Sequence, residues 1–148
     1  MLRGLDPILN GDLLKVLCDM GHGDQIAVVD ANFTAYRLAA GRPVLRLDGV
    51  GLLRACEAIL SVLPLDDDLL QPAAYMQVTG SAPDFRTPVQ SAVVAAVQRL
   101  AGRPATACEA VERFAFYTRA AQAVAVVQTG ELTPFANFLF AKAVILPP

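Results

Sequence analysis

The sequence predicts a three-layer α/β/α sandwich built on a mixed, mostly parallel sheet of about six strands. Short apolar segments alternate with segments of helical spacing along the whole chain, and this alternation favours a sheet with helices on both faces. The chain has 148 residues, which is the usual size of one domain. It contains neither a linker nor an internal repeat. We therefore expect one domain over residues 1–148.

Helices are indicated by apolar spacing and by the residues that flank them. Asn10 or Asp12 can cap the first helix, and Asp48 is expected to cap the second. Thr87 followed by Pro88 is typical of a helix start, because proline suits the first helical position. The predicted helices span residues 10–20, 50–62, 88–101 and 113–121. The predicted strands span residues 25–30, 43–47, 73–79, 108–112, 123–129 and 138–146.

The composition is unusually apolar. Hydrophobic residues make up 55% of the chain and charged residues 18%, whereas about 25% is usual for charged residues. A membrane segment does not explain this, because no stretch approaches the roughly 20 apolar residues that a spanning helix needs. The most apolar segment, Phe135 to Pro148, is short and contains Asn137 and Lys142. We therefore expect no membrane partner and predict a homo-oligomer with a buried subunit interface.

Charge and cysteine content exclude further classes. The net charge is −2 and the arginines are scattered, so no basic run exists to follow nucleic-acid phosphates. The three widely spaced cysteines are typical of reduced, mostly buried thiols. The amino-terminal sequence has no continuous apolar core of signal-peptide length. These features favour a cytoplasmic protein.

Common catalytic motifs are absent from the sequence. It contains no phosphate-binding G-x-x-x-x-G-K-[ST], no G-x-G-x-x-G and no G-x-S-x-G. No cysteine pair has metal-ligand spacing, and one histidine cannot supply a histidine-based zinc site. The acidic run Asp66 to Asp68 reads as a solvated turn rather than a metal site, since no second ligand cluster accompanies it. We expect neither a metal nor a cofactor.

One histidine remains as a candidate for acid/base chemistry. His22 lies between two glycines in the segment MGHGD, before the strand that ends on Asp30. The glycines allow a tight turn and leave space around the ring, and ligands gather at the carboxyl ends of strands in α/β sheets. Histidine and carboxylate together form a competent acid/base pair near neutral pH. The alternatives are an ordinary surface or core histidine and an aspartate that caps a turn.

Four segments carry a family signature. They are MLRGLDPILNGDLLKVLCDMGHGDQIAVVDANF at residues 1–33, RLDGVGLLRACEAIL at 46–60, ERFAFYTRAAQAVAVVQTGE at 112–131 and PFANFLFAKAV at 134–144. Together they resemble the fucose mutarotase / ribose pyranase (FucU/RbsD) family over nearly the whole chain. Residues 80–105 are the least informative part.

The resemblance implies roles for individual residues. It makes His22 the proton donor and Asp30 a sugar ligand, and Arg113 matches the sugar-binding arginine of the fucose branch. Tyr117 is either a further sugar contact or a half-buried core aromatic. The family's sugar-binding Tyr-Gly-Asn triplet reads Phe135, Ala136 and Asn137 here, so only the asparagine is retained and the tyrosine hydroxyl is lost. Asn32 and Tyr36 replace histidines that are frequent in fucose-type members.

The resemblance also implies a function. It predicts a cofactor-independent mutarotase that interconverts the anomers of L-fucose or a related monosaccharide, in a closed ring of subunits such as a decamer. Members of this family complete their sites with residues from a neighbouring subunit. One alternative is a ribose pyranase, against which Arg113 argues, because the ribose branch has a histidine there. The other is a sugar-binding module that has lost catalysis through Phe135 and Ala136.

Overall fold

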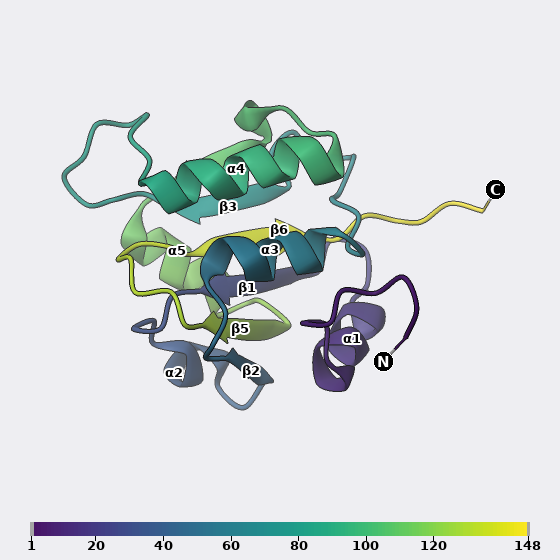
Figure 1. Ribbon diagram of the computed structural model, residues 1–148. Helices are drawn as coiled ribbons and strands as arrows, with labels where there is room; N and C mark the ends of the chain where they lie inside the picture. The colour runs from purple at the N-terminus through teal and green to yellow at the C-terminus, as the bar shows by residue number, and fades with distance from the viewer. Residues whose placement is uncertain (1, 148) are drawn as a thin grey trace.

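The computed structural model of the protein describes residues 2–147 and confirms the predicted fold class (Figure 1). Six strands form one sheet in the order β2-β5-β1-β6-β3-β4. The strands are β1 (Gln25–Val29), β2 (Val44–Leu47), β3 (Ala73–Met76), β4 (Cys108–Val111), β5 (Ala125–Thr129) and β6 (Phe138–Ala141).

Strand β6 runs against the direction of its neighbours. It pairs antiparallel with both β1 and β3, whereas the pairs β1–β5, β2–β5 and β3–β4 are parallel. Phe138, the first residue of β6, lies opposite Val28 of β1 and Tyr75 of β3. The residues just before β6 therefore meet the residues that follow β1 and β3, at the carboxyl ends of those strands.

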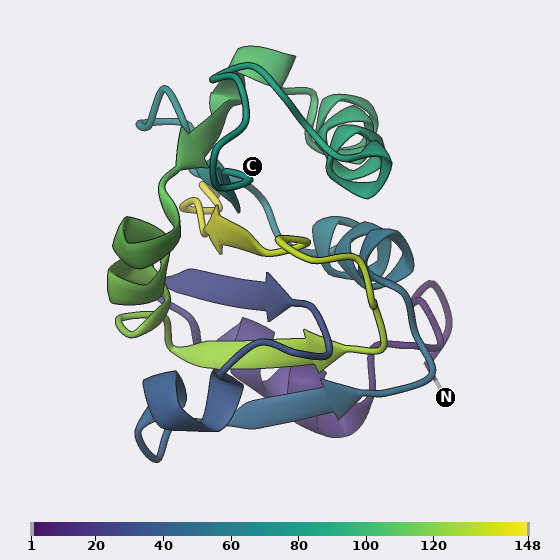
Figure 2. The same ribbon diagram turned by 90° about the vertical axis from the view of Figure 1, so that its left-hand side faces the viewer.

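Helices cover both faces of the sheet, as predicted. Figure 2 shows α3 and α4 on one side of the strands and α2 and α5 on the other. Helix α1 packs on the α3/α4 face. The helices are α1 (Gly11–Asp19), α2 (Ala35–Ala39), α3 (Leu52–Leu60), α4 (Pro88–Ala101) and α5 (Arg113–Ala120), with a 3₁₀ turn, η1, at Ala105–Ala107.

The two cores follow from the alternation of side chains along each strand. In β1, Ile26 and Val28 face the α1/α3/α4 layer, whereas Ala27 and Val29 face the α2/α5 layer. All four are fully buried. Because the central strand is covered on both sides, its sequence is continuously apolar rather than alternating. No helix in the described part of the chain is long and apolar enough to cross a membrane.

Two helix starts are as predicted and one differs. The Asn10 side chain accepts a hydrogen bond from Leu13 N–H, and Thr87 forms a capping box with Gln90 at the start of α4. The prediction that Asp48 caps the next helix is wrong. Helix α3 begins at Leu52 with Gly51 at its N-cap, and Asp48 instead forms an ion pair with Arg46 at 2.6 Å.

Further features differ from the sequence-based expectation, and β3 ends at Met76 rather than at residue 79. The short helix α2 was not predicted. The last strand ends at Ala141 rather than at residue 146. Ala141 lies opposite Gln25, the first residue of β1, and Phe140 lies opposite Ala73, the first residue of β3. Beyond Ala141 only an isolated antiparallel bridge between Lys142 and Leu65 continues the pairing, and the apolar residues 144–146 are exposed rather than part of the strand.

Candidate functional site

A polar pocket lies at the carboxyl ends of β1 and β3. It has a volume of about 290 Å³, and its lining comes from the loop after β1, the end of β3, the start of α5 and the turn before β6. The lining residues are Asp30, Asn32, Phe33, Met76, Arg113, Tyr117, Pro134, Phe135 and Asn137. The pocket thus brings together Asp30, Arg113, Tyr117, Phe135 and Asn137, five of the residues singled out from the sequence.

Asp30 and Asn137 form the buried floor of this pocket. Asp30 N–H donates to Asn137 Oδ1 at 2.9 Å, and Asn137 Nδ2 donates to Asp30 Oδ2 at 2.9 Å. The second carboxylate oxygen, Oδ1, accepts from the backbone N–H of Asn32 at 2.9 Å. Only 5% of Asp30 and 2% of Asn137 is exposed. These bonds fix the carboxylate at the base of the pocket.

The electrostatics of Asp30 suit a group that exchanges protons or holds hydroxyls. Burial raises the pKa of the Asp30 carboxyl above its ordinary value, because it disfavours the charged form. Hydrogen bonds from Asn137, Asn32 and Phe33 act in the opposite direction, and the negative charge of Glu131 adds to the rise. The net pKa shift is upward.

Arg113 and Tyr117 form the outer wall on helix α5. They lie one turn apart, and Arg113 Nε donates to the Tyr117 hydroxyl at 3.0 Å. The guanidinium carbon also lies 5.4 Å from the centroid of the Tyr117 ring, within cation–π range. Among the described residues, no hydrogen bond or ion pair engages the Nη groups of Arg113. The four N–H donors of the two Nη groups are therefore free to bind hydroxyl groups in the pocket.

The turn before β6 forms the remaining wall. Phe135 has φ +64°, a left-handed conformation that is uncommon for a bulky residue. Its carbonyl accepts hydrogen bonds from Asn137 N–H and from Gln90 Nε2, both at 2.8 Å. Ala136 is fully buried and belongs to the apolar core on the α1/α3/α4 face. Its side chain therefore lies outside the pocket lining.

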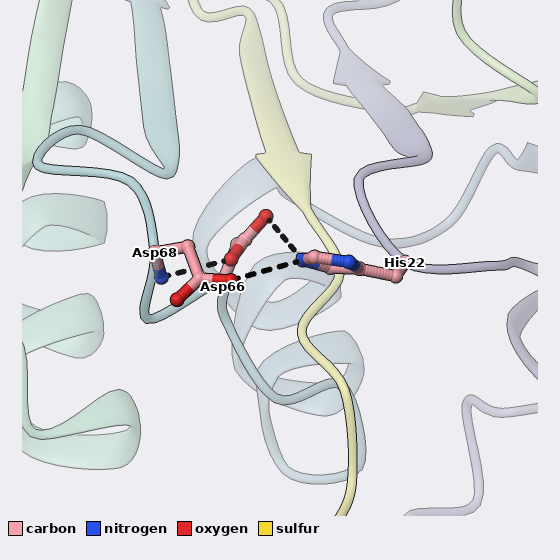
Figure 3. Close-up of side chains that lie close together, drawn as sticks. All are labelled: His22, Asp66 and Asp68. Atoms are coloured by element: carbon pink, nitrogen blue, oxygen red, sulfur yellow. Dashed lines mark hydrogen bonds and ion pairs between the residues drawn. The ribbon is translucent and has the colours of Figure 1, made fainter.

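The structure places His22 elsewhere. It precedes β1, whereas Asp30 follows it, and a five-residue strand spans about 16 Å. His22 Nε2 lies 3.2 Å from Asp66 Oδ2 and 3.7 Å from Asp68 Oδ2 (Figure 3). The imidazole side chain is 44% exposed. Within one chain His22 and Asp30 therefore do not form a pair, because the strand that joins them holds them apart.

Asp66 is a site residue that the sequence analysis missed. We expected residues 66–68 to be a solvated turn, but only Asp67 and Asp68 are exposed and Asp66 is buried. Asp66 N–H donates to Ala141 O at 3.0 Å, and Asp66 Oδ1 accepts from Asp68 N–H at 3.0 Å. These bonds bring its carboxylate to His22. No local signal distinguishes Asp66 from its neighbours, since its burial depends on pairing with the end of β6.

The His22 cluster, defined as His22, Asp66 and Asp68, has two chemical capacities. The carboxylates can orient the imidazole ring, as acid/base catalysis by histidine requires. The three side chains also offer ligand atoms that lie within 4.8 Å of one another, so they are the residues that could hold a metal ion. A depression of about 250 Å³ adjoins the cluster, and Ala143, Val144 and Leu146 contribute to its walls.

Comparison with known proteins identifies the family to which the chain is similar. A model of the RbsD / FucU transport protein family matches residues 3–145. The L-fucose mutarotase of Glaesserella parasuis is 43% identical over 145 residues, which are 97% of this chain and 96% of that protein. The structure of FucU from Bifidobacterium longum has 38% identity and a TM-score of 0.90, with 97% of this chain and 100% of that chain covered.

A third relative was solved with a sugar. The fucose mutarotase of Streptococcus pneumoniae, in complex with L-fucose, has 30% identity and a TM-score of 0.87. The match covers 98% of this chain and 100% of that chain. The family match over residues 3–145 spans the sheet, the pocket at Asp30 and the His22 cluster.

Proposed function

The chain belongs to the RbsD / FucU transport protein family, and we propose that it is a mutarotase for L-fucose or a closely related monosaccharide. This proposal rests mainly on one observation: the side chains of Asp30, Asn137 and Arg113 line the same pocket. A fixed carboxylate, an amide and a guanidinium are suited to binding several hydroxyl groups with defined geometry. The relatives named fucose mutarotase, one of them in complex with L-fucose, support the choice of sugar.

The reaction needs only proton transfer. Opening a cyclic hemiacetal requires one proton delivered to the ring oxygen and one withdrawn from the anomeric hydroxyl, and closure on the other face reverses both transfers. Positioned acid/base groups typically contribute about 10²–10⁴-fold each. His22 is the proton donor and acceptor in this proposal, with Asp66 orienting its ring. Asp30, Arg113 and Asn137 hold the sugar, with Tyr117 and Phe135 as flanking contacts.

A second copy of the chain completes the site in this proposal. His22 and Asp30 lie at opposite ends of β1, so the two halves of the site must come from different copies. Exposed apolar side chains border each half. Phe114, 68% exposed, packs on Tyr117 near the pocket, and Val144 and Leu146 lie beside His22 with 51% and 77% exposure. Such groups favour burial in an interface.

The assembly that we propose is a closed ring of copies, for which the family resemblance suggests a decamer. Light scattering at micromolar concentration should give a mass several times the 15.7 kDa of one chain. A monomer under these conditions contradicts the shared site.

The shared site has a direct test in hybrid oligomers. His22→Ala and Arg113→Ala each damage one half, so separately purified variants should have little activity. When the two variants are co-expressed, their copies mix randomly in each ring. About one quarter of the sites then contain both intact halves. Anomer exchange should then recover to about a quarter of the wild-type rate. Hybrids no more active than either variant alone contradict a site between copies.

A cytoplasmic location belongs to the same proposal. Cys18, Cys56 and Cys108 are all free thiols. Burial raises the pKa of the Cys108 thiol to about 11, so this thiol stays protonated and unreactive. Cys56 is also buried, whereas Cys18 is exposed. Unpaired cysteines are typical of a reducing compartment.

The experiment that tests the activity is magnetisation-transfer NMR of anomer exchange. The panel comprises L-fucose, D-ribose, L-rhamnose and D-galactose. We expect the enzyme to accelerate exchange of L-fucose or of a sugar with similar stereochemistry. Accelerated pyranose–furanose exchange of D-ribose indicates a pyranase instead. Binding without accelerated exchange of any sugar indicates the sugar-binding module, which the loss of the tyrosine hydroxyl at Phe135 would favour.

A further inference from the structure

Gln90 is a buried polar residue that connects three elements around the pocket. It is the third residue of α4 and has no exposed surface. Its Nε2 donates to Met76 O and to Phe135 O, both at 2.8 Å. Its Oε1 accepts from Thr87 N–H at 2.9 Å. One amide group thus joins the start of a helix, the end of β3 and the turn before β6.

Both carbonyls that Gln90 holds belong to the pocket. Met76 and Phe135 line it, whereas Gln90 itself does not. Phe135 is the residue with φ +64°, a conformation that a bulky side chain adopts only when its surroundings impose it. The hydrogen bond from Gln90 to the Phe135 carbonyl is one such constraint, since it fixes the orientation of the peptide group that follows Phe135.

The effect of this constraint reaches the substrate-binding groups through Asn137. The same Phe135 carbonyl accepts a hydrogen bond from Asn137 N–H at 2.8 Å. The Asn137 side chain in turn holds Asp30 through two hydrogen bonds. A displaced Phe135 carbonyl therefore moves the backbone that aims the Asn137 amide.

We propose that Gln90 is a positioning residue for sugar binding, which acts through the carbonyls of Met76 and Phe135 to set the Phe135–Asn137 turn against Asp30. This inference rests on the proposed mutarotase function. It assigns Gln90 no contact with substrate. It explains why an amide, rather than an apolar side chain, occupies a fully buried position beside the pocket, because only a primary amide can donate to both carbonyls and accept from Thr87 N–H.

The test compares two variants at the same helix start. Gln90→Met keeps the length and approximate volume of the side chain but removes both donors. Thr87→Ala is the matched control: it removes the other half of the capping box and leaves both carbonyl contacts of Gln90 in place. Both variants should lower Tm, because each weakens the start of α4.

Sugar affinity separates the two variants. Gln90→Met should raise the dissociation constant for L-fucose about ten-fold, the size expected for the loss of one or two hydrogen bonds in the binding wall. The exchange rate at saturating sugar should change much less, because His22 is untouched. Thr87→Ala should leave the dissociation constant unchanged. If Gln90→Met lowers Tm without changing affinity, its role is structural only and the proposal is wrong.

A second readout does not depend on sugar. In oligomers of full-length protein, hydrogen–deuterium exchange of the peptide containing Asn137 N–H should accelerate in Gln90→Met and stay unchanged in Thr87→Ala. Should wild type bind and exchange no sugar, the proposed function fails, and this readout still decides whether Gln90 orders the turn.

Should Gln90→Met not fold, Gln90→Glu keeps the acceptor for Thr87 N–H while replacing the donor amide. The same losses are expected, and normal affinity and protection in that variant refute the proposal.

Discussion

The buried pair between Asn137 and Asp30 makes a measurable contribution to stability. Asn137→Ala removes one hydrogen bond to the Asp30 carboxylate and the acceptor of the Asp30 N–H. A bond to a charged group contributes about 1.5–3 kcal/mol, and an unsatisfied buried N–H costs about 1–3 kcal/mol. Because the pocket admits some water to the vacated space, we take the lower part of this range. The free energy of unfolding should fall by about 3 kcal/mol at pH 7.

The same substitution should change the pH dependence of stability. Burial raises the pKa of Asp30 above its ordinary value of 3.8, and the Asn137 bond opposes that rise. Removing the bond therefore raises the pKa further. A carboxyl whose pKa is raised by folding binds its proton more tightly in the native state. The stability from that proton is fully present below pH 3.8 and is lost as pH rises through the folded pKa. The deficit of Asn137→Ala should thus shrink as pH falls.

Urea unfolding followed by circular dichroism measures both effects. The protein concentration is matched, because the proposed association between copies would contribute to stability. The deficit at pH 7 should exceed the deficit at pH 4. Asn32→Ala is the control, since Asn32 bonds Asp30 only through its backbone N–H, and it should change stability by less than about 0.5 kcal/mol. A deficit that is equal at both pH values, or as small as that of the control, refutes the role assigned to this pair.

Three further predictions concern catalysis. His22→Ala should lower the anomer exchange rate by about 10²–10⁴-fold while sugar binding persists. Arg113→Ala should mainly raise the dissociation constant for the sugar, about ten- to hundred-fold, because it removes about 1.5–3 kcal/mol of binding free energy. NMR exchange measures the first effect and calorimetric titration the second. Activity should survive exhaustive EDTA treatment, and a loss restored by zinc or manganese would instead assign a metal to the His22 cluster. Phe135→Tyr should raise the exchange rate or widen the range of sugars in the NMR panel, and an unchanged profile argues against a substrate contact at this position.

Local interactions made much of the fold predictable from the sequence. The start of α4 depends on Thr87, Pro88 and Gln90, which lie within one turn of each other, so the capping pattern is visible in the chain. Asp48 illustrates the limit of such patterns. Its side chain could cap a helix, but an ion pair with Arg46 competes for it, and Gly51 starts the helix with no side-chain cap. The sequence does not show which of two local partners is preferred.

Some residues of the candidate pocket could be named from the sequence, but their arrangement could not. Asp30, Arg113 and Asn137 were singled out from motif positions, and the structure brings them into one pocket. The burial of Asp66 and its approach to His22 depend on contacts with the end of β6, about 75 residues away in the chain. Gln90 is similar, since its partners Met76 and Phe135 belong to different strands and turns. Such long-range partners leave no pattern in a short window of sequence.

The separation of His22 from Asp30 has a consequence for the geometry of assembly. If each copy presents a His22 cluster at one edge and a sugar pocket at the opposite edge, contact between copies joins two different surfaces. Interfaces of this head-to-tail kind either close into a ring or continue into an open chain. An open chain leaves one pocket without a histidine and one histidine without a pocket, whereas a ring completes every site. Closure therefore gives each copy one complete site, and it also buries the exposed apolar residues at both edges of every copy.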